Sequence, residues 1–179
     1  MKKIFTTLAL CAAAAVPAFA LTPTYKGFGE MQTGYAIPSG KFYDGGAMYG
    51  LATSHGVSLF DGLFVGLGAE LDLTYYTEHD YHEDDTDYSA LAVLFAEGRY
   101  KILRTKRVSP FVGVRLGGGF NGIDEEGCFY FSPAAGCTFD LTERFGFDAS
   151  IGYELFTGGS KDWQAGNINC IAFRIGVHF

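Results

Sequence analysis

Apolar and polar or small side chains alternate along nearly the whole chain after residue 20. From Leu63 to Tyr75, for example, every second residue is apolar, while the residues between them are mostly Gly, Glu, Asp or Thr. This period of two predicts β-strands with one apolar face and one polar face. We count eight such segments, at about residues 25–37, 48–59, 63–76, 88–103, 110–120, 128–141, 145–156 and 169–179.

The connections between these segments alternate between long and short. Asp61-Gly62 lies between two apolar runs and is typical of a two-residue β-hairpin, and the connections over 104–109 and 142–144 are also short. The long connections span about 38–47, 77–87, 121–127 and 157–168. Short turns at one end and long loops at the other predict an all-β, up-and-down meander of eight antiparallel strands.

The composition excludes three other classes of protein. Aromatic residues make up 16% of the chain, whereas disordered chains are poor in them. The 25 glycines disfavour a helical bundle, because glycine is among the weakest helix formers. A net charge of −7 and a pI near 5.0 exclude a basic nucleic-acid-binding protein.

The first twenty residues have the three-part pattern of a secretory signal peptide. Lys2 and Lys3 form a basic start, residues 4–16 are apolar, and Ala18-Phe19-Ala20 matches a cleavage site between small residues. Beyond this segment, no stretch reaches the roughly 20 apolar residues that a membrane-spanning helix needs. We therefore predict a cleaved signal peptide over residues 1–20 and one β-domain over residues 21–179.

Periodicity alone does not say whether the apolar face points into a barrel or out of it. A soluble lipocalin-like calyx would turn that face inward around a ligand, whereas a membrane barrel would turn it outward to lipid. The opposite face is rich in Gly, Ser and Ala, which suits the narrow interior of an eight-stranded barrel. Aromatic residues lie near both ends of the apolar face, as in interfacial girdles: Tyr35, Tyr49, Tyr75, Tyr88, Phe129 and Tyr153 near the long loops, and Tyr100, Phe139, Phe145 and Phe179 near the short turns. These features favour a transmembrane β-barrel with four long extracellular loops and three short periplasmic turns.

The C-terminal segment Phe173-Arg174-Ile175-Gly176-Val177-His178-Phe179 alternates in period two and ends in an aromatic residue. In this respect the chain after residue 20 resembles the small eight-stranded outer-membrane β-barrel proteins of Gram-negative bacteria. The resemblance implies a place in the bacterial outer membrane, surrounded by outer-membrane lipid and lipopolysaccharide. It also implies recognition by the outer-membrane assembly machinery, through a signal made of Phe173, Ile175, Val177 and Phe179.

The face assigned to the interior carries charges of both signs. It holds seven acids and five bases, namely Glu30, Glu70, Asp72, Glu97, Asp140, Asp148 and Glu154 with Lys26, Arg99, Lys101, Arg115 and Arg174. Charges withdrawn from water need partners, and eight strands leave an interior that side chains just fill. We therefore predict a closed, ion-paired lumen, with a narrow channel or proton path as the alternative. The predicted network consists of Glu30, Glu70, Asp72, Glu97, Arg99, Arg115, Asp148, Glu154 and Arg174.

The long loops are predicted to be acidic, above all the stretch 77–87. Carboxylates suit Ca²⁺ and imidazoles suit Zn²⁺, so the candidate ligands of a metal ion there are His79, His82, Asp84 and Asp85. The stretch lacks the glycine-turned spacing of a calcium loop, and a solvated hairpin tip is the simpler interpretation. We therefore expect no metal ion and no cofactor.

Three cysteines follow residue 20, and none is expected to form a disulfide. Cys128 and Cys137 lie nine residues apart on one predicted strand, a separation of about 30 Å. Cys128 and Cys170 both face inward, but one strand lies between them, which places their backbones beyond disulfide reach.

These expectations point to an outer-membrane barrel with a structural or surface-interaction role, whose extracellular partner the sequence does not name. We do not expect an enzyme, because His55 and His178 map to the periplasmic end, and the histidines of the acidic loop lack a convincing serine partner. The alternatives left open are narrow-channel transport or lipid modification on the same barrel, and a soluble secreted ligand binder.

Overall fold

The computed structural model describes residues 23–37, 43–59, 62–80, 83–103, 107–121, 126–142, 144–157 and 167–179. Their secondary structure consists of eight strands: β1 (Thr24–Ile37), β2 (Tyr43–Leu59), β3 (Leu63–Asp80), β4 (Glu83–Lys101), β5 (Val108–Asn121), β6 (Glu126–Asp140), β7 (Gly146–Thr157) and β8 (Asn167–His178). In this part of the chain there is no helix of a length and apolarity sufficient to span a membrane. The predicted signal peptide lies outside the described residues.

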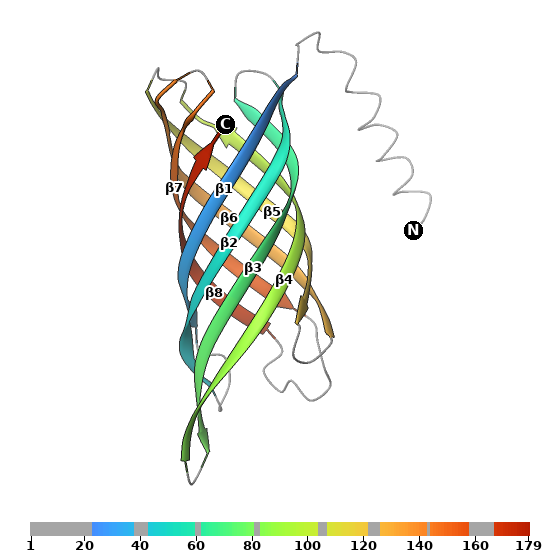
Figure 1. Cartoon of the computed structure of the whole chain (residues 1–179), viewed down its shortest axis with the longest axis vertical. Helices are drawn as coiled ribbons and strands as arrows, with labels where there is room; N and C mark the ends of the chain where they lie inside the picture. The colour runs from blue at the N-terminus through green and yellow to red at the C-terminus, as the bar shows by residue number, and fades with distance from the viewer. Residues whose placement is uncertain are drawn as a thin grey trace, which may run out of the picture.

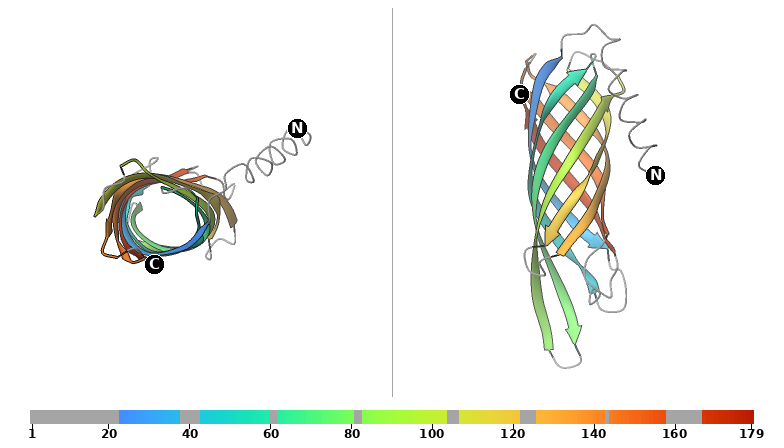
Figure 2. Two further views of the ribbon diagram at one scale, coloured as in Figure 1. Left: turned by 90° about the horizontal axis from the view of Figure 1, so that it is seen from above. Right: turned by 90° about the vertical axis from the view of Figure 1, so that its right-hand side faces the viewer.

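The eight strands form one closed barrel (Figure 1). Each strand pairs antiparallel with the next along the chain, and β8 pairs antiparallel with β1, which closes the sheet. Seen along its axis the barrel is a complete ring (Figure 2, left). A closed sheet satisfies its backbone hydrogen bonds without leaving a strand edge. The prediction of an eight-stranded antiparallel up-and-down β-barrel is confirmed.

The two ends of the barrel differ in how far the strands reach. We call the end where β1, β3, β5 and β7 finish the loop end, and the opposite end the turn end. β3 and β4 remain paired up to Asp80 and Glu83, so that their hairpin projects past the other strands (Figure 2, right). The expectation of a long loop over 77–87 is therefore wrong. Residues beyond an apolar wall need no apolar face, so a pattern of hydropathy cannot reveal strands there.

The outer wall of the barrel is apolar. Leu67 and Leu94 are 71% and 72% exposed, and they belong to a large set of outward aliphatic side chains along the strands. Outward aromatic side chains lie toward both ends of this band: Tyr35, Tyr49, Tyr75, Phe129 and Tyr153 near the loop end, and Tyr100, Phe139, Phe145 and Phe179 near the turn end. The side chain of Tyr88 lies outside the described set. An apolar band between aromatic girdles is typical of a barrel that faces lipid.

At the seam between β1 and β8, the C-terminal residue docks on a glycine. The backbone amides of Gly27 and Phe179 each donate to the other residue's carbonyl, at 2.8 and 3.0 Å. The Phe179 ring covers Gly27 so closely that a Cβ there would lie 2.7 Å from ring carbons. The ring edge also meets the His55 ring, whose Nδ1 lies 2.6 Å from the Tyr25 hydroxyl. Gly27 therefore provides the space that Phe179 occupies.

Candidate functional site

The polar face of the strands lines the lumen. Because successive side chains alternate between faces, pairs such as Glu30 and Gln32, or Glu97 and Arg99, enter the lumen one above the other. The register of the barrel brings such pairs from several strands to one level. We call this level the central layer; its buried members are Glu30, Gln32, Glu70, Asp72, Glu97, Arg99, Arg115, Tyr130, Ser132, Glu154 and Arg174.

One half of the central layer is built on two arginines that share two glutamates. Arg99 donates from Nη2 to Glu30 Oε1 at 2.6 Å and from Nε to Glu97 Oε1 at 2.5 Å. Arg115 donates from Nη2 to the other oxygen of Glu30 and from Nε to Glu97 Oε1 at 3.3 Å. The Arg99 guanidinium also lies 4.1 Å from the centre of the Phe28 ring. Each of these two glutamates therefore contacts two positive charges.

The other half joins three further acids through Gln32 and Arg174. The Gln32 amide nitrogen donates to Glu70 Oε1 at 2.8 Å and to Asp72 Oδ1 at 2.5 Å. The Gln32 amide oxygen accepts a hydrogen bond from Arg174 Nε at 3.0 Å. Arg174 Nη2 donates to Glu154 Oε1 at 2.5 Å. Arg115 Nη1 donates to Glu70 Oε2 at 2.9 Å and so links the two halves. The layer is one continuous polar network.

A separate polar cluster lies on the turn-end side of the central layer. The two ring nitrogens of His178 lie 2.7 Å from Asp148 Oδ2 and 3.1 Å from Asp140 Oδ1. The Thr138 hydroxyl donates to Asp148 Oδ1 at 2.7 Å, and Lys101 Nζ donates to Asp140 Oδ2 at 3.1 Å. We call this group the turn-end cluster. Asp140 and Lys101 are partly exposed, so this cluster reaches the water at the barrel mouth.

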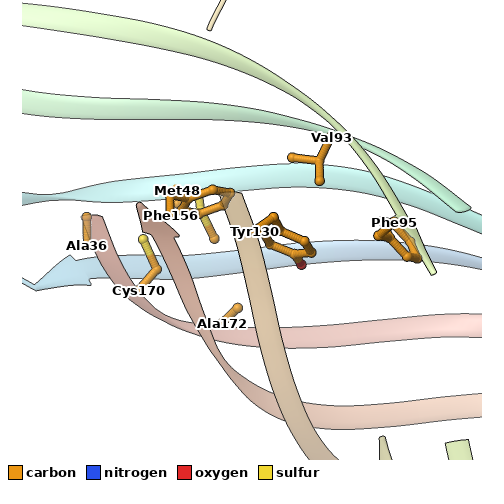
Figure 3. Close-up of a cluster of buried hydrophobic side chains, with 8 residues drawn as sticks. All are labelled: Ala36, Met48, Val93, Phe95, Tyr130, Phe156, Cys170 and Ala172. Carbon is orange, nitrogen blue, oxygen red and sulfur yellow. The ribbon is translucent and has the colours of Figure 1, made fainter. Parts of the chain in front are cut away.

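An apolar cluster fills the lumen on the loop-end side of the central layer. Figure 3 shows Met48, Phe156 and Cys170 side by side, with Tyr130 between them and Phe95. Tyr130 and Phe95 meet the central layer, because the Tyr130 hydroxyl lies 3.3 Å from Glu70 and the Arg115 guanidinium lies 4.7 Å from the centre of the Phe95 ring. The buried members of this apolar cluster are Ala36, Met48, Val93, Phe95, Tyr130, Phe156, Cys170 and Ala172. Cys128 packs against it, and the cysteines at 128, 137 and 170 are all free thiols.

A small cavity lies within the described part of the lumen. A cavity of about 10 Å³ lies among Arg99, Arg115 and Arg174, with Phe111 and Ser150 also in its lining. That volume holds about one water molecule. A continuous aqueous path would have to displace both the ionic network and the apolar cluster.

The nine residues of the predicted network all lie buried in the lumen, but they do not form one group. Eight of them belong to the central layer, whereas Asp148 belongs to the turn-end cluster with His178. Sequence reasoning missed Gln32, Tyr130 and Ser132, although all three have inward parity on their strands. It also missed the apolar cluster, because the prediction considered only the charged residues of the inward face.

Inward glycines also shape the central layer. A Cβ on Gly50 would lie 2.0 Å from Asp72 Oδ1 and 2.8 Å from the Gln32 amide nitrogen. A Cβ on Gly176 would lie 2.6 Å from Glu30 Cγ. The long polar side chains therefore lie flat against strand backbones that carry no side chain at those points.

The candidate metal ligands lie in the projecting hairpin. The register places His79 opposite Asp84, and Glu78 opposite Asp85. His82 lies outside the described residues, and the other hairpin side chains are not among the described ones. Within the described side chains, no group of three or more His, Cys, Asp or Glu residues is placed to hold a metal ion.

Several solved structures have the same architecture, and the alignment with this chain covers nearly their whole length. Neisserial surface protein A aligns with a TM-score of 0.62 at 16% identity, over 88% of this chain and 98% of its own. The outer membrane protein OprG of Pseudomonas aeruginosa aligns with a TM-score of 0.54 at 11% identity, over 89% and 97%. This chain has the fold of the small outer-membrane β-barrels. The outer membrane enzyme PagL shares it too, with a TM-score of 0.51 at 11% identity, over 82% and 97%.

At these identities the likeness shows the fold and does not assign a role. No protein-family model matches the sequence, and the search of curated proteins finds no match. The function must therefore be argued from the residues of this chain.

Proposed function

We propose that this chain is a non-enzymatic, integral protein of the bacterial outer membrane that acts through contacts at the cell surface rather than by conducting solutes. The observation that carries the proposal is the filled lumen inside an apolar outer wall. The central layer and the apolar cluster occupy the space that a channel would need, and the outward band of leucines and aromatics suits lipid. The first twenty residues would serve as the cleaved export signal.

The projecting β3–β4 hairpin is the proposed contact surface. β4 pairs with β5 only from Leu91 onward, so the segment Glu83–Ala90 has no strand on that side within the described residues. The hairpin carries six acids, which are Glu78, Asp80, Glu83, Asp84, Asp85 and Asp87. Its register sets like charges opposite each other at Glu78 and Asp85, an arrangement that costs stability unless a cationic partner neutralises it. A basic partner therefore suits this surface best.

Two measurements test this proposal. Purified protein in a planar bilayer should give no steady conductance, and its boiled and unboiled forms should migrate differently on SDS gels. A shortened variant, in which Asn-Gly replaces residues 77–86 between the paired Tyr76 and Asp87, should keep the barrel but lose binding of a polylysine probe. A large steady conductance in the intact protein would overturn the closed-lumen part, and unchanged polylysine binding by the shortened variant would overturn the contact surface.

We also propose that Phe179 completes the assembly signal with Phe173, Ile175 and Val177. Phe173, Ile175 and Phe179 point outward from β8 and its end, where another protein can reach them. Changing Phe179 to Asp should lower the amount of protein in the outer membrane while leaving export intact, as measured by fractionation. Gly27→Val keeps the signal residues but blocks the docking place of the ring, so it separates recognition of Phe179 from closure of the seam.

A further inference from the structure

The charges of the central layer do not balance. Its acids are Glu30, Glu70, Asp72, Glu97 and Glu154, and its bases are Arg99, Arg115 and Arg174. Five acids against three bases leave an excess of two carboxyl groups. All eight residues are at most 6% exposed, so water does not compensate the difference. Buried groups in such a position become neutral rather than remain charged.

The contacts separate the acids that stay ionised from those that share protons. Glu30 and Glu97 each receive hydrogen bonds from both Arg99 and Arg115, which favours their charged forms. The other three acids, which we call the carboxyl triad, are Glu70, Asp72 and Glu154. Glu70 accepts a hydrogen bond from Arg115, and Glu154 accepts one from Arg174. Asp72 has only the Gln32 amide as a donor among the described residues.

Asp72 is the member of the triad that most needs a proton. Its Oδ1 and Glu70 Oε1 accept from the same Gln32 nitrogen, so the two carboxyl groups lie side by side. Two carboxyl groups at such close range do not both ionise. Asp72 Oδ2 is buried and has no hydrogen-bond partner, and a neutral carboxyl tolerates that better than a carboxylate does.

The second proton follows from the position of Tyr130. Its hydroxyl lies 3.3 Å from both oxygens of Glu70 and 3.3 Å from Glu154 Oε1. A phenol has a single proton and can donate to only one of the two carboxyl groups. The contact with the other is a hydrogen bond only if that carboxyl itself holds a proton. Glu154 Oε2 is a further buried oxygen without a partner.

We propose that the carboxyl triad binds two protons in the folded barrel, one on Asp72 and one shared by Glu70 and Glu154 across Tyr130. With both protons bound, three carboxylates face three arginines and the central layer is neutral. The titratable and charged groups that face the triad are Glu30 on β1, Glu97 and Arg99 on β4, Arg115 on β5, Tyr130 on β6, and Cys170 and Arg174 on β8; β2 contributes no charged side chain to the described lumen. The closed lumen is thus a proton-binding site.

Proton binding makes the stability of the barrel depend on pH. Removal of the two protons at alkaline pH leaves two uncompensated negative charges in the central layer, so the wild-type barrel should unfold at a lower urea concentration there. The variant Asp72→Asn with Glu154→Gln carries neutral groups of the same shape and has no such protons to lose. Its urea midpoint should match the wild type at neutral pH and should fall less at alkaline pH.

A matched control removes the same number of carboxyl groups from the same layer. Glu30→Gln with Glu97→Gln strands Arg99 and Arg115, and should lower the urea midpoint at neutral pH. Equal losses at neutral pH for the two double variants would overturn the proposal.

Infrared spectroscopy tests the wild-type protein directly. The carbonyl band of a protonated carboxylic acid should be present in folded barrel at neutral pH and absent from the Asp72→Asn, Glu154→Gln variant. The same band in both proteins, or in neither, would overturn the proposal. If the double variant does not fold, the two single variants serve instead, each with a weaker band.

Discussion

The central layer and the apolar cluster fill the same lumen by opposite means. The central layer uses directed hydrogen bonds between charges, so each side chain depends on named partners such as Arg115 with Glu30. The apolar cluster uses volume, so a side chain such as Met48 depends on the space around it and not on one partner. Loss of a member should therefore harm the central layer more, because it leaves a buried charge rather than a void.

Arg115→Ala should have the largest effect. It removes the donor to Glu30, Glu70 and Glu97 together, with an expected loss of about 3–5 kcal/mol in the free energy of unfolding. The planar bilayer should nevertheless stay silent, because the apolar cluster still fills the lumen on the loop-end side. Arg144→Ala, at an exposed position in the turn between β6 and β7, is the matched control. It should leave the free energy of unfolding and the absence of conductance unchanged. Equal stability of the two variants would contradict the importance of the central layer.

Met48→Ala should have an intermediate effect on urea unfolding. The side chain is 1% exposed among apolar neighbours, and its truncation should cost about 2–3 kcal/mol through lost packing and the cavity left behind. The bilayer should stay silent, because the ionic network remains intact. Met48→Leu conserves volume and should cost less than about 1.5 kcal/mol. A leak through the Met48→Ala form would show that the apolar cluster, and not the central layer, closes the lumen.

Thr138→Val should have the smallest effect of the three. The shape of the side chain is retained, but Asp148 loses one donor, which should cost about 1.5 kcal/mol. His178 still contacts the other oxygen of Asp148, and the turn-end cluster reaches water, so the loss stays limited. Thr33→Val, on the exposed face of β1, gives the reference for the same change outside the lumen. A loss as great as that of Arg115→Ala would show that the turn-end cluster stabilises the barrel as much as the central layer does.

The sequence by itself determined the number of strands, the two faces of each strand and the charged residues of the lumen. Alternation of side chains is a property of the extended backbone, so it places Glu97 on the polar face of its strand. The small residues of that face and the aromatic residues at the ends of the other face assign the polar face to the lumen. The alternation of apolar and polar residues stops where the β3–β4 hairpin extends beyond the apolar wall. The predicted end of β3 and start of β4 are therefore several residues short of the observed ones, Asp80 and Glu83.

Only the tertiary structure decided which of these side chains meet. Arg115 reaches Glu30 across 85 positions of sequence, and Gln32 lies between two acids of β3. Such meetings depend on the stagger of the strands and on the width of the closed barrel, and neither is encoded in local periodicity. The same closure gathers five acids and three bases into one buried layer, an imbalance of charge that protons can correct.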